Sequence, residues 1–181
     1  LLAAAQCVHQ CGENPHDDAG WLAGQATALP AALRGRYRVV PFVTDGLADL
    51  YAAVTLVVGR SGAGTVTELA ALGLPSILIP LPGARGDEQT ANARVLADAG
   101  AAVLLPEREL TAERLVGVVG ELLGDRPRLE RMAQRADFVI VANKFLQNWA
   151  EDAGAEHVTC IPTVVDLRRY PQRPLPPAEP F

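Results

Sequence analysis

Short apolar runs alternate along this chain with longer segments in which apolar residues recur at helical spacing. Five of the short runs are predicted to be strands: 6–11, 38–43, 54–58, 76–81 and 102–105. The runs 54–58 (VTLVV) and 76–81 (SILIPL) are almost wholly apolar. Such continuity is typical of parallel strands that are covered on both faces. We therefore expect the middle of the chain to be the interior of a parallel sheet.

Helices are expected between these strands, because capping residues mark most of the intervening segments. The predicted helices run from Asp17 or Asp18 to Ala28, from Thr44-Asp45 to Ala53, from Thr65 to Leu72, from Asp87 to Ala99, from Thr111 to Leu123 and from Pro127 to Ala136. Pro30 is expected to interrupt or restart the first helix. Gly73 and Gly100 are expected to end the third and fourth. In the fifth, the apolar positions at helical spacing are Val116, Val119, Leu122 and Leu123.

This alternation predicts an α/β fold, a Rossmann-like parallel sheet flanked by helices and joined by right-handed crossovers. Ligands of such sheets bind beyond the carboxyl ends of the strands. The segments 60–65 and 82–89 each follow a predicted strand. We therefore expect the two segments to face one crevice.

The segment from Arg60 to Thr65 (RSGAGT) turns a strand directly into a helix. The first-turn N–H groups of a helix have no partner within it, and the helix dipole adds partial positive charge there. Gly62 and Gly64 would let a ligand approach the backbone closely. Glu68, about one turn further along, supplies a carboxylate that can accept hydrogen bonds from the vicinal hydroxyls of a ribose. The pattern fits a nucleotide diphosphate that carries a sugar.

Other interpretations of these residues stay open. Thr65 and Glu68 also fit a capping box, in which the glutamate reaches back to the helix start. Gln89 can equally be a solvated first-turn residue. Cys7, His9 and Cys11 would share one face of a strand, but no fourth ligand is marked, so we expect no metal site.

Composition narrows the class of protein. A length of 181 residues suits one domain, or one domain and part of a second. No apolar run approaches the roughly 18 residues that cross a membrane. The net charge of −5 gives no support to binding of nucleic acid or anionic membranes. Three cysteines suggest a reducing compartment. The opening LLAAA has neither Met nor a basic segment, so we read it as the interior of an element in a longer protein.

Five phrases carry a family resemblance: VHQ at 8–10, VPFVTD at 40–45, RSGAGTVTEL at 60–69, GLPSILIP at 73–80 and DEQTANA at 87–93. Together and in this order, they make residues 1–136 resemble the carboxyl-terminal half of the MurG-type transferases of peptidoglycan synthesis. Those enzymes move N-acetylglucosamine (GlcNAc) from UDP-GlcNAc to lipid I, which is undecaprenyl-pyrophosphoryl-MurNAc-pentapeptide. The resemblance implies one half of a GT-B fold and an inverting transfer. It implies UDP-GlcNAc as donor substrate and no cofactor.

The same resemblance implies where the donor is held. The backbone near Val43 and Thr44 would read the uracil edge, and Glu68 would hold the ribose hydroxyls. Gln89 and its neighbour Glu88 would contact the GlcNAc hydroxyls, although relatives more often carry Gln or His where Glu88 stands. The expected substrate-binding residues are Val43, Thr44, Arg60, Ser61, Gly62, Ala63, Gly64, Thr65, Glu68, Glu88, Gln89 and Asn92. No catalytic base is assigned, since the family's amino-terminal domain, which binds the lipid-linked acceptor, is not in this sequence. The implied location is the cytoplasm, at the inner face of the plasma membrane.

Beyond residue 136 the sequence no longer resembles the MurG-type family. The phrases DFVIVANKFL at 137–146 and IPTVVD at 161–166 resemble the last strand–helix–strand of the amino-terminal domain in retaining, glycogen-synthase-like glycosyltransferases. We therefore predict a donor domain (1–136), a strand–helix–strand segment (137–169) and a proline-rich tail (170–181), joined as a fusion or an assembly. Such a chain is expected to bind donor with little or no turnover. The alternatives are an enzyme like UDP-GlcNAc 2-epimerase, or a non-catalytic UDP-sugar-binding hybrid.

Overall fold

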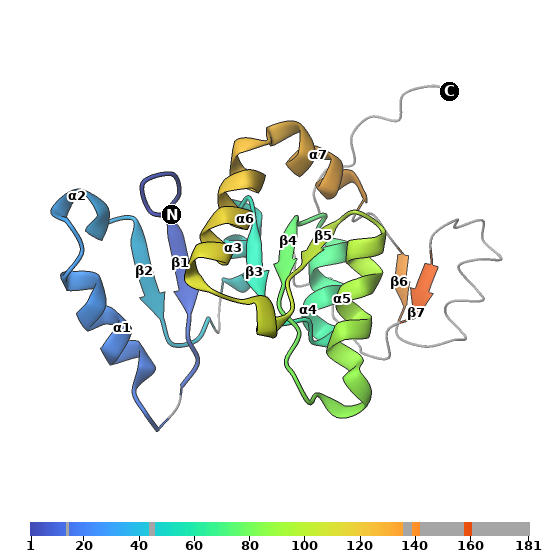
Figure 1. Ribbon diagram of the computed structural model, residues 1–181, viewed down its shortest axis with the longest axis horizontal. Coiled ribbons are helices and arrows are strands. Elements are labelled where there is room, and N and C mark those ends of the chain that lie inside the picture. Colours follow the sequence, from blue (N-terminus) through green and yellow to red (C-terminus); the bar gives the residue numbers. More distant parts are fainter. Residues whose placement is uncertain (14, 44–45, 136–138, 142–157, 161–181) are drawn as a thin grey trace. The chain divides into compact units, whose positions relative to one another are not determined.

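The computed structural model describes residues 1–13, 15–43, 46–135, 139–141 and 158–160. The chain divides into two compact units, Leu1–Leu47 and Ala48–Phe181 (Figure 1). None of the described residues in the first unit is buried, so the hydrophobic core lies in the second. No helix in the described parts of the chain is long and apolar enough to cross a bilayer.

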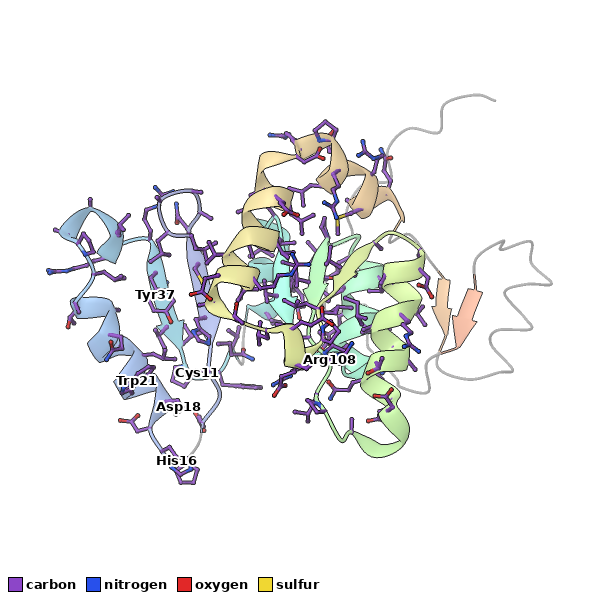
Figure 2. The ribbon with its side chains drawn as sticks, viewed as in Figure 1. Cys11, His16, Asp18, Trp21, Tyr37 and Arg108 are labelled. Atoms are coloured by element: carbon purple, nitrogen blue, oxygen red, sulfur yellow. The ribbon has the colours of Figure 1, made fainter. Side chains whose placement is uncertain are left out.

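The first unit contains one pair of parallel strands and two helices between them. Its elements are β1 (Cys7–Gln10), α1 (Asp18–Thr27), α2 (Ala31–Arg34) and β2 (Tyr37–Val40). Asp17 caps α1 as predicted, because its side chain accepts a hydrogen bond of 3.1 Å from the N–H of Gly20. The strand β2 ends at Val40, earlier than expected, since Pro41 has no N–H to continue the ladder. Trp21 of α1 is exposed (Figure 2).

The second unit is built on a parallel sheet with the strand order β3-β4-β5. The three strands are β3 (Val57–Gly59), β4 (Ser76–Leu78) and β5 (Ala102–Leu104). Its helices and 3₁₀ turns are α3 (Leu47–Ala53, which begins at the unit boundary), α4 (Ala63–Ala71), η1 (Arg85–Asp87), α5 (Glu88–Asp98), η2 (Glu107–Glu109), α6 (Ala112–Gly124) and α7 (Arg126–Arg135). The strand predicted from residue 54 starts only at Val57, because the N–H of Val54 still bonds to Leu50 at the end of α3.

The central strand β4 explains how the core is layered. All three of its residues are buried, as predicted for a parallel strand covered on both faces. Successive side chains of a strand point to opposite faces. Leu78 accordingly packs in one cluster with residues of α4 and α5, whereas Ile77 packs in a second cluster with residues of α6 and α7. The two helix pairs thus cover opposite faces of the sheet (Figure 1).

Glycines end α4 and α5 as the sequence predicts. Gly73 and Gly100 follow these helices with φ values of 61° and 77°, in the left-handed region that glycine adopts most easily. At the end of α4, the N–H of Leu74 bonds to the carbonyl of Leu69 at 3.0 Å. The equivalent bond at the end of α5 joins Ala101 to Leu96 at 2.8 Å. These bonds turn the chain from each helix into the strand that follows.

The buried face of α6 differs from the prediction. Thr111 caps the helix as expected, accepting a bond of 3.1 Å from Arg114. Val118, Val119 and Leu122 are buried, but Val116 is 45% exposed, so its assignment to the apolar face was wrong. Helical spacing alone is compatible with a buried face that includes Val116 or one that includes Val118. Val118 is the buried one, because it packs in the same cluster as Ile77 and residues of α7.

Val118→Ala is expected to lower the free energy of unfolding by about 2 to 3 kcal/mol, because it leaves a cavity in the core. Val116→Ala, two residues earlier on the same helix, should change it by less than about 0.5 kcal/mol. Urea unfolding followed by circular dichroism compares the two variants. Equal effects would contradict the placement of this helix.

The segment after α7 contains two further strands, β6 (Val139–Val141) and β7 (Val158–Cys160), which pair in parallel. The sequence analysis expected a strand–helix–strand segment at 137–169, and both strands lie within it. The helix expected between them, and the proline-rich tail, lie outside the described residues. The proposed domain boundary at 136 stays a prediction.

Candidate functional site

The amino-terminal end of α4 is open. The helix begins at Ala63, and Gly62 precedes it with an extended backbone (φ −60°, ψ 151°). The first helical bond runs from the N–H of Val66 to the carbonyl of Gly62. Within the part of the chain that the structure describes, no side chain caps this end. The N–H groups of its first turn are therefore available to an anion, and the helix dipole favours negative charge there.

The observed start of α4 corrects three predictions. The helix begins two residues before Thr65, because Gly62 rather than Thr65 takes the N-cap position. A capping box needs the glutamate at the third helical residue, and Thr65 occupies that position. The capping-box interpretation of Glu68 is therefore wrong. Glu68 is the sixth residue of α4, nearly two turns inside rather than one.

The two glycines at this end are not required by the chain's own packing. A Cβ at Gly62 or Gly64 would meet no other atom within 4 Å, and neither residue has a positive φ. Glycine within a helix costs up to about 1 kcal/mol relative to alanine. Both positions therefore leave open space beside the uncapped N–H groups, and at Gly64, which lies inside the helix, glycine has a cost in stability. That combination indicates room for a group from outside the chain.

Glu68 lies on the same face of α4 as Gly64, because the two are four residues apart. Helix side chains lean toward the amino-terminal end, so the carboxylate lies toward the open first turn. The hydroxyl of Tyr51, from α3, donates to Glu68 Oε2 at 3.4 Å. Burial, together with the charge and hydrogen bond of Glu68, raises the pKa of Tyr51 to about 12. The site thus carries one partly buried carboxylate with a fixed neighbour.

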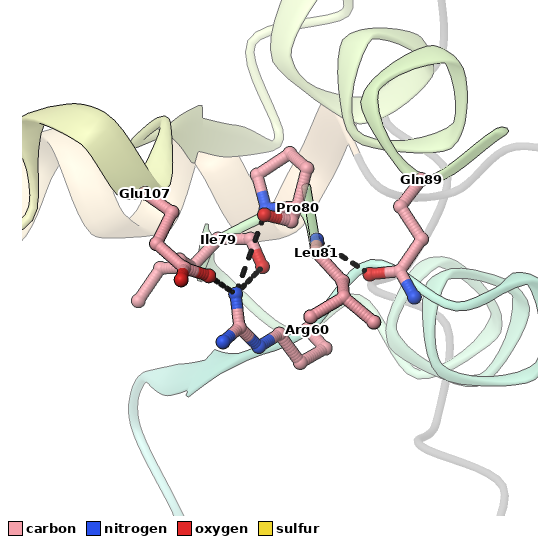
Figure 3. Close-up of polar contacts among 6 residues, drawn as sticks. All are labelled: Arg60, Ile79, Pro80, Leu81, Gln89 and Glu107. Atoms are coloured by element: carbon pink, nitrogen blue, oxygen red, sulfur yellow. Dashed lines mark hydrogen bonds and ion pairs between the residues drawn. The ribbon is translucent and has the colours of Figure 1, made fainter. Parts of the chain in front are cut away.

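Arg60, directly after β3, joins the carboxyl ends of all three strands (Figure 3). Its Nη1 donates at 3.3 Å to the carbonyls of Ile79 and Pro80, which follow β4. It also forms an ion pair with Glu107, which follows β5. The sequence analysis placed Arg60 beside the nucleotide. In this structure its guanidinium holds the three strand ends together, and contact with a ligand stays a prediction.

Residues at the start of α5 complete the same end of the sheet. The buried hydroxyl of Ser61 donates to the carbonyl of Gln89 at 2.8 Å, and the amide of Asn92 donates to the carbonyl of Ser61 at 3.2 Å. These bonds confirm that the segments after β3 and β4 lie side by side. The hydroxyl of Ser61 is thus engaged with α5. The predicted contact of Ser61 with the donor stays a prediction.

Gln89 has a defined orientation. Its Oε1 accepts a bond of 3.0 Å from the N–H of Leu81 (Figure 3), which leaves the NH₂ group to donate. Glu88 beside it is exposed. Asp87 stands at the N-cap of α5 as predicted, but with φ 55° and without a side-chain capping bond. Its left-handed backbone follows Gly86, which has φ 66°.

The first unit contains the residue predicted to read the base. The N–H of Val43 donates at 3.0 Å to Oε1 of Gln10, so use of this N–H by a ligand requires Gln10 to move. Thr44 lies outside the described residues.

Two of the three residues considered as metal ligands have other partners. Nδ1 of His9 and the hydroxyl of Tyr37 are 2.8 Å apart, and the thiol of Cys11 lies 3.6 Å from the carbonyl of Val40. Burial raises the pKa of the Cys7 thiol. Among the described residues, no three His, Cys, Asp or Glu side chains are grouped so as to hold a metal ion.

Residues 2–152 match the glycosyltransferase family 28 C-terminal domain. The chain belongs to this family. A relative from Azoarcus sp. (strain BH72) is 48% identical over 131 residues, which is 72% of this chain and 34% of the relative. One from Alkalilimnicola ehrlichii is 54% identical over 96 residues, 53% of this chain and 27% of the relative. Both are named UDP-N-acetylglucosamine–N-acetylmuramyl-(pentapeptide) pyrophosphoryl-undecaprenol N-acetylglucosamine transferase.

The crystal structure of MurG from Acinetobacter baumannii is similar, with a TM-score of 0.59 and 37% identity over 71% of this chain and 37% of that one. This similarity confirms the predicted fold class, a Rossmann-like half of a GT-B protein. The chain spans about a third of the length of the curated relatives it matches. The family match continues past residue 136, where the sequence analysis placed a change of domain.

Two neighbours of the site escaped the sequence analysis. Tyr51 is 17 residues from Glu68, and Glu107 is 47 residues from Arg60. Neither Tyr51 nor Glu107 lies in a recognised motif or at helical spacing from its partner. The local sequence therefore does not indicate either contact.

Proposed function

We propose that this chain is the donor-binding half of a glycosyltransferase that moves GlcNAc from UDP-GlcNAc to lipid I in peptidoglycan synthesis. The observation that carries the proposal is the uncapped start of α4, with open space at two glycines and Glu68 on the same face. The names of the family's relatives support the choice of donor and acceptor. With a lipid-linked acceptor, the working location is the cytoplasmic face of the plasma membrane.

The chemistry follows from the positions of these groups. The acceptor hydroxyl attacks the anomeric carbon in line while UDP leaves, which inverts the configuration. The first-turn N–H groups and dipole of α4 stabilise the charge that develops on the departing diphosphate. Glu68 accepts hydrogen bonds from the ribose hydroxyls, and the NH₂ group of Gln89 donates to an oxygen of the sugar.

The general base is not assigned to any residue of this chain. Since the relatives are about three times as long as the matched region, we propose that turnover requires parts of the protein beyond it. This chain is expected to bind UDP-GlcNAc without transferring its sugar at a measurable rate.

Calorimetric titration of the purified chain with UDP, UDP-GlcNAc and ADP tests the proposal. We expect binding of both uridine nucleotides and markedly weaker binding of ADP. A chain that is folded by circular dichroism but binds neither uridine nucleotide would contradict the proposal. Incubation with UDP-GlcNAc and lipid I should yield no transferred GlcNAc, and release of N-acetylmannosamine would indicate an epimerase instead.

A further inference from the structure

Tyr51 is fixed in place by the core of the second unit. Its ring is half-buried on α3 and packs against the apolar cluster that includes Val66 and Leu69, on the inner face of α4. The hydroxyl at the end of the ring donates to Glu68 Oε2. The packing of the ring therefore determines where the hydroxyl lies, and the hydroxyl in turn holds the carboxylate.

We infer that Tyr51 is a positioning residue that holds Glu68 ready to accept the vicinal hydroxyls of a ribose. The inference rests on the proposed function, since it concerns the same nucleotide site. A carboxylate offers about four acceptor positions. Tyr51 uses one of them, so enough remain for both the 2′- and 3′-hydroxyls. Tyr51 thereby becomes a determinant of selection for ribose over 2′-deoxyribose.

Two physical arguments support this role. A glutamate side chain has several rotatable bonds, and holding it before the ligand arrives removes an entropy cost that binding would otherwise include. The hydroxyl also stays a donor throughout the physiological range, because tyrosine ionises only at about pH 10 and the pKa of Tyr51 is raised further, to about 12. It therefore keeps its bond to Glu68 instead of adding a second negative charge to the site.

The test compares UDP with 2′-deoxy-UDP in calorimetric titrations of the wild-type chain and Tyr51→Phe. The substitution keeps the ring and removes only the hydroxyl. We expect the affinity for UDP to fall roughly three- to tenfold, as for loss of one hydrogen bond, with a smaller fall for 2′-deoxy-UDP, which offers Glu68 only its 3′-hydroxyl. The preference for ribose should shrink accordingly. Tyr37→Phe removes a hydroxyl that contacts His9 instead and should leave both affinities unchanged.

The outcomes separate the inference from the proposed function. If the wild type binds neither nucleotide, both fail. If the wild type prefers UDP and Tyr51→Phe keeps that preference, or loses both affinities equally, only the inference fails. In a Glu68→Ala background, where Tyr51 has no side-chain acceptor left to position at residue 68, Tyr51→Phe should have no further effect on UDP binding, and an additive loss would overturn the inference.

A second measurement does not depend on the folding of a Tyr51 variant. The chain has three tyrosines, and ultraviolet titration follows their ionisation. Glu68→Gln should lower the pKa of the most weakly acidic tyrosine, because the negative charge beside it is removed. An unchanged titration would show that the hydroxyl does not contact Glu68, and would overturn the inference.

Discussion

Gly64→Ala is expected to stabilise the fold and weaken UDP binding at the same time. The added methyl group meets no atom of the chain within 4 Å, so the fold accommodates it. Alanine favours the helix over glycine by up to about 1 kcal/mol. The same methyl group would stand in the space beside the first-turn N–H groups. We expect a loss of UDP affinity of roughly 10- to 100-fold, as for a side chain forced into an occupied volume.

Gly120→Ala is the matched control. Gly120 lies within α6, and a Cβ there also meets open space. This variant should gain comparable stability and leave UDP binding unchanged. Urea unfolding and calorimetric titration of the three proteins provide both quantities. Unchanged UDP affinity in Gly64→Ala would show that the open end of α4 is not the diphosphate site.

Glu68→Gln is expected to weaken UDP binding by roughly 10- to 100-fold, because hydrogen bonds to a charged group contribute about 1.5 to 3 kcal/mol. The amide has nearly the shape of the carboxylate but lacks its charge and offers one acceptor atom instead of two. The fold should be retained, since Glu68 is only partly buried. Titration with UDP measures the loss, and circular dichroism checks the fold.

Glu121→Gln provides the control for the change in net charge. Glu121 is exposed on α6 and not on α4, so its substitution removes one negative charge outside the proposed site. We expect its UDP affinity to equal that of the wild type. An equal loss of UDP affinity in both variants would indicate a general electrostatic effect. An unchanged affinity in Glu68→Gln would show that this carboxylate does not bind the nucleotide.

The sequence by itself determined the order of the elements and indicated where the proposed site lies along the chain. The apolar run at β4 identified a doubly covered strand, and the glycines at 73 and 100 identified the helix ends. These features depend on backbone conformation and side-chain pattern within a few residues, so they can be read locally. The phrases that resemble the family placed the proposed anion-binding turn before α4.

Tertiary structure decided what the site's side chains touch. It placed the start of α4 at Ala63, exposed Val116 and paired Arg60 with Glu107. It also brought Tyr51 to Glu68. The partners in these pairs are far apart in sequence, and helical periodicity leaves the buried face of α6 open by about one residue. Only the packing of helices on the sheet selects one arrangement, because the contacts that fix it come from separate elements.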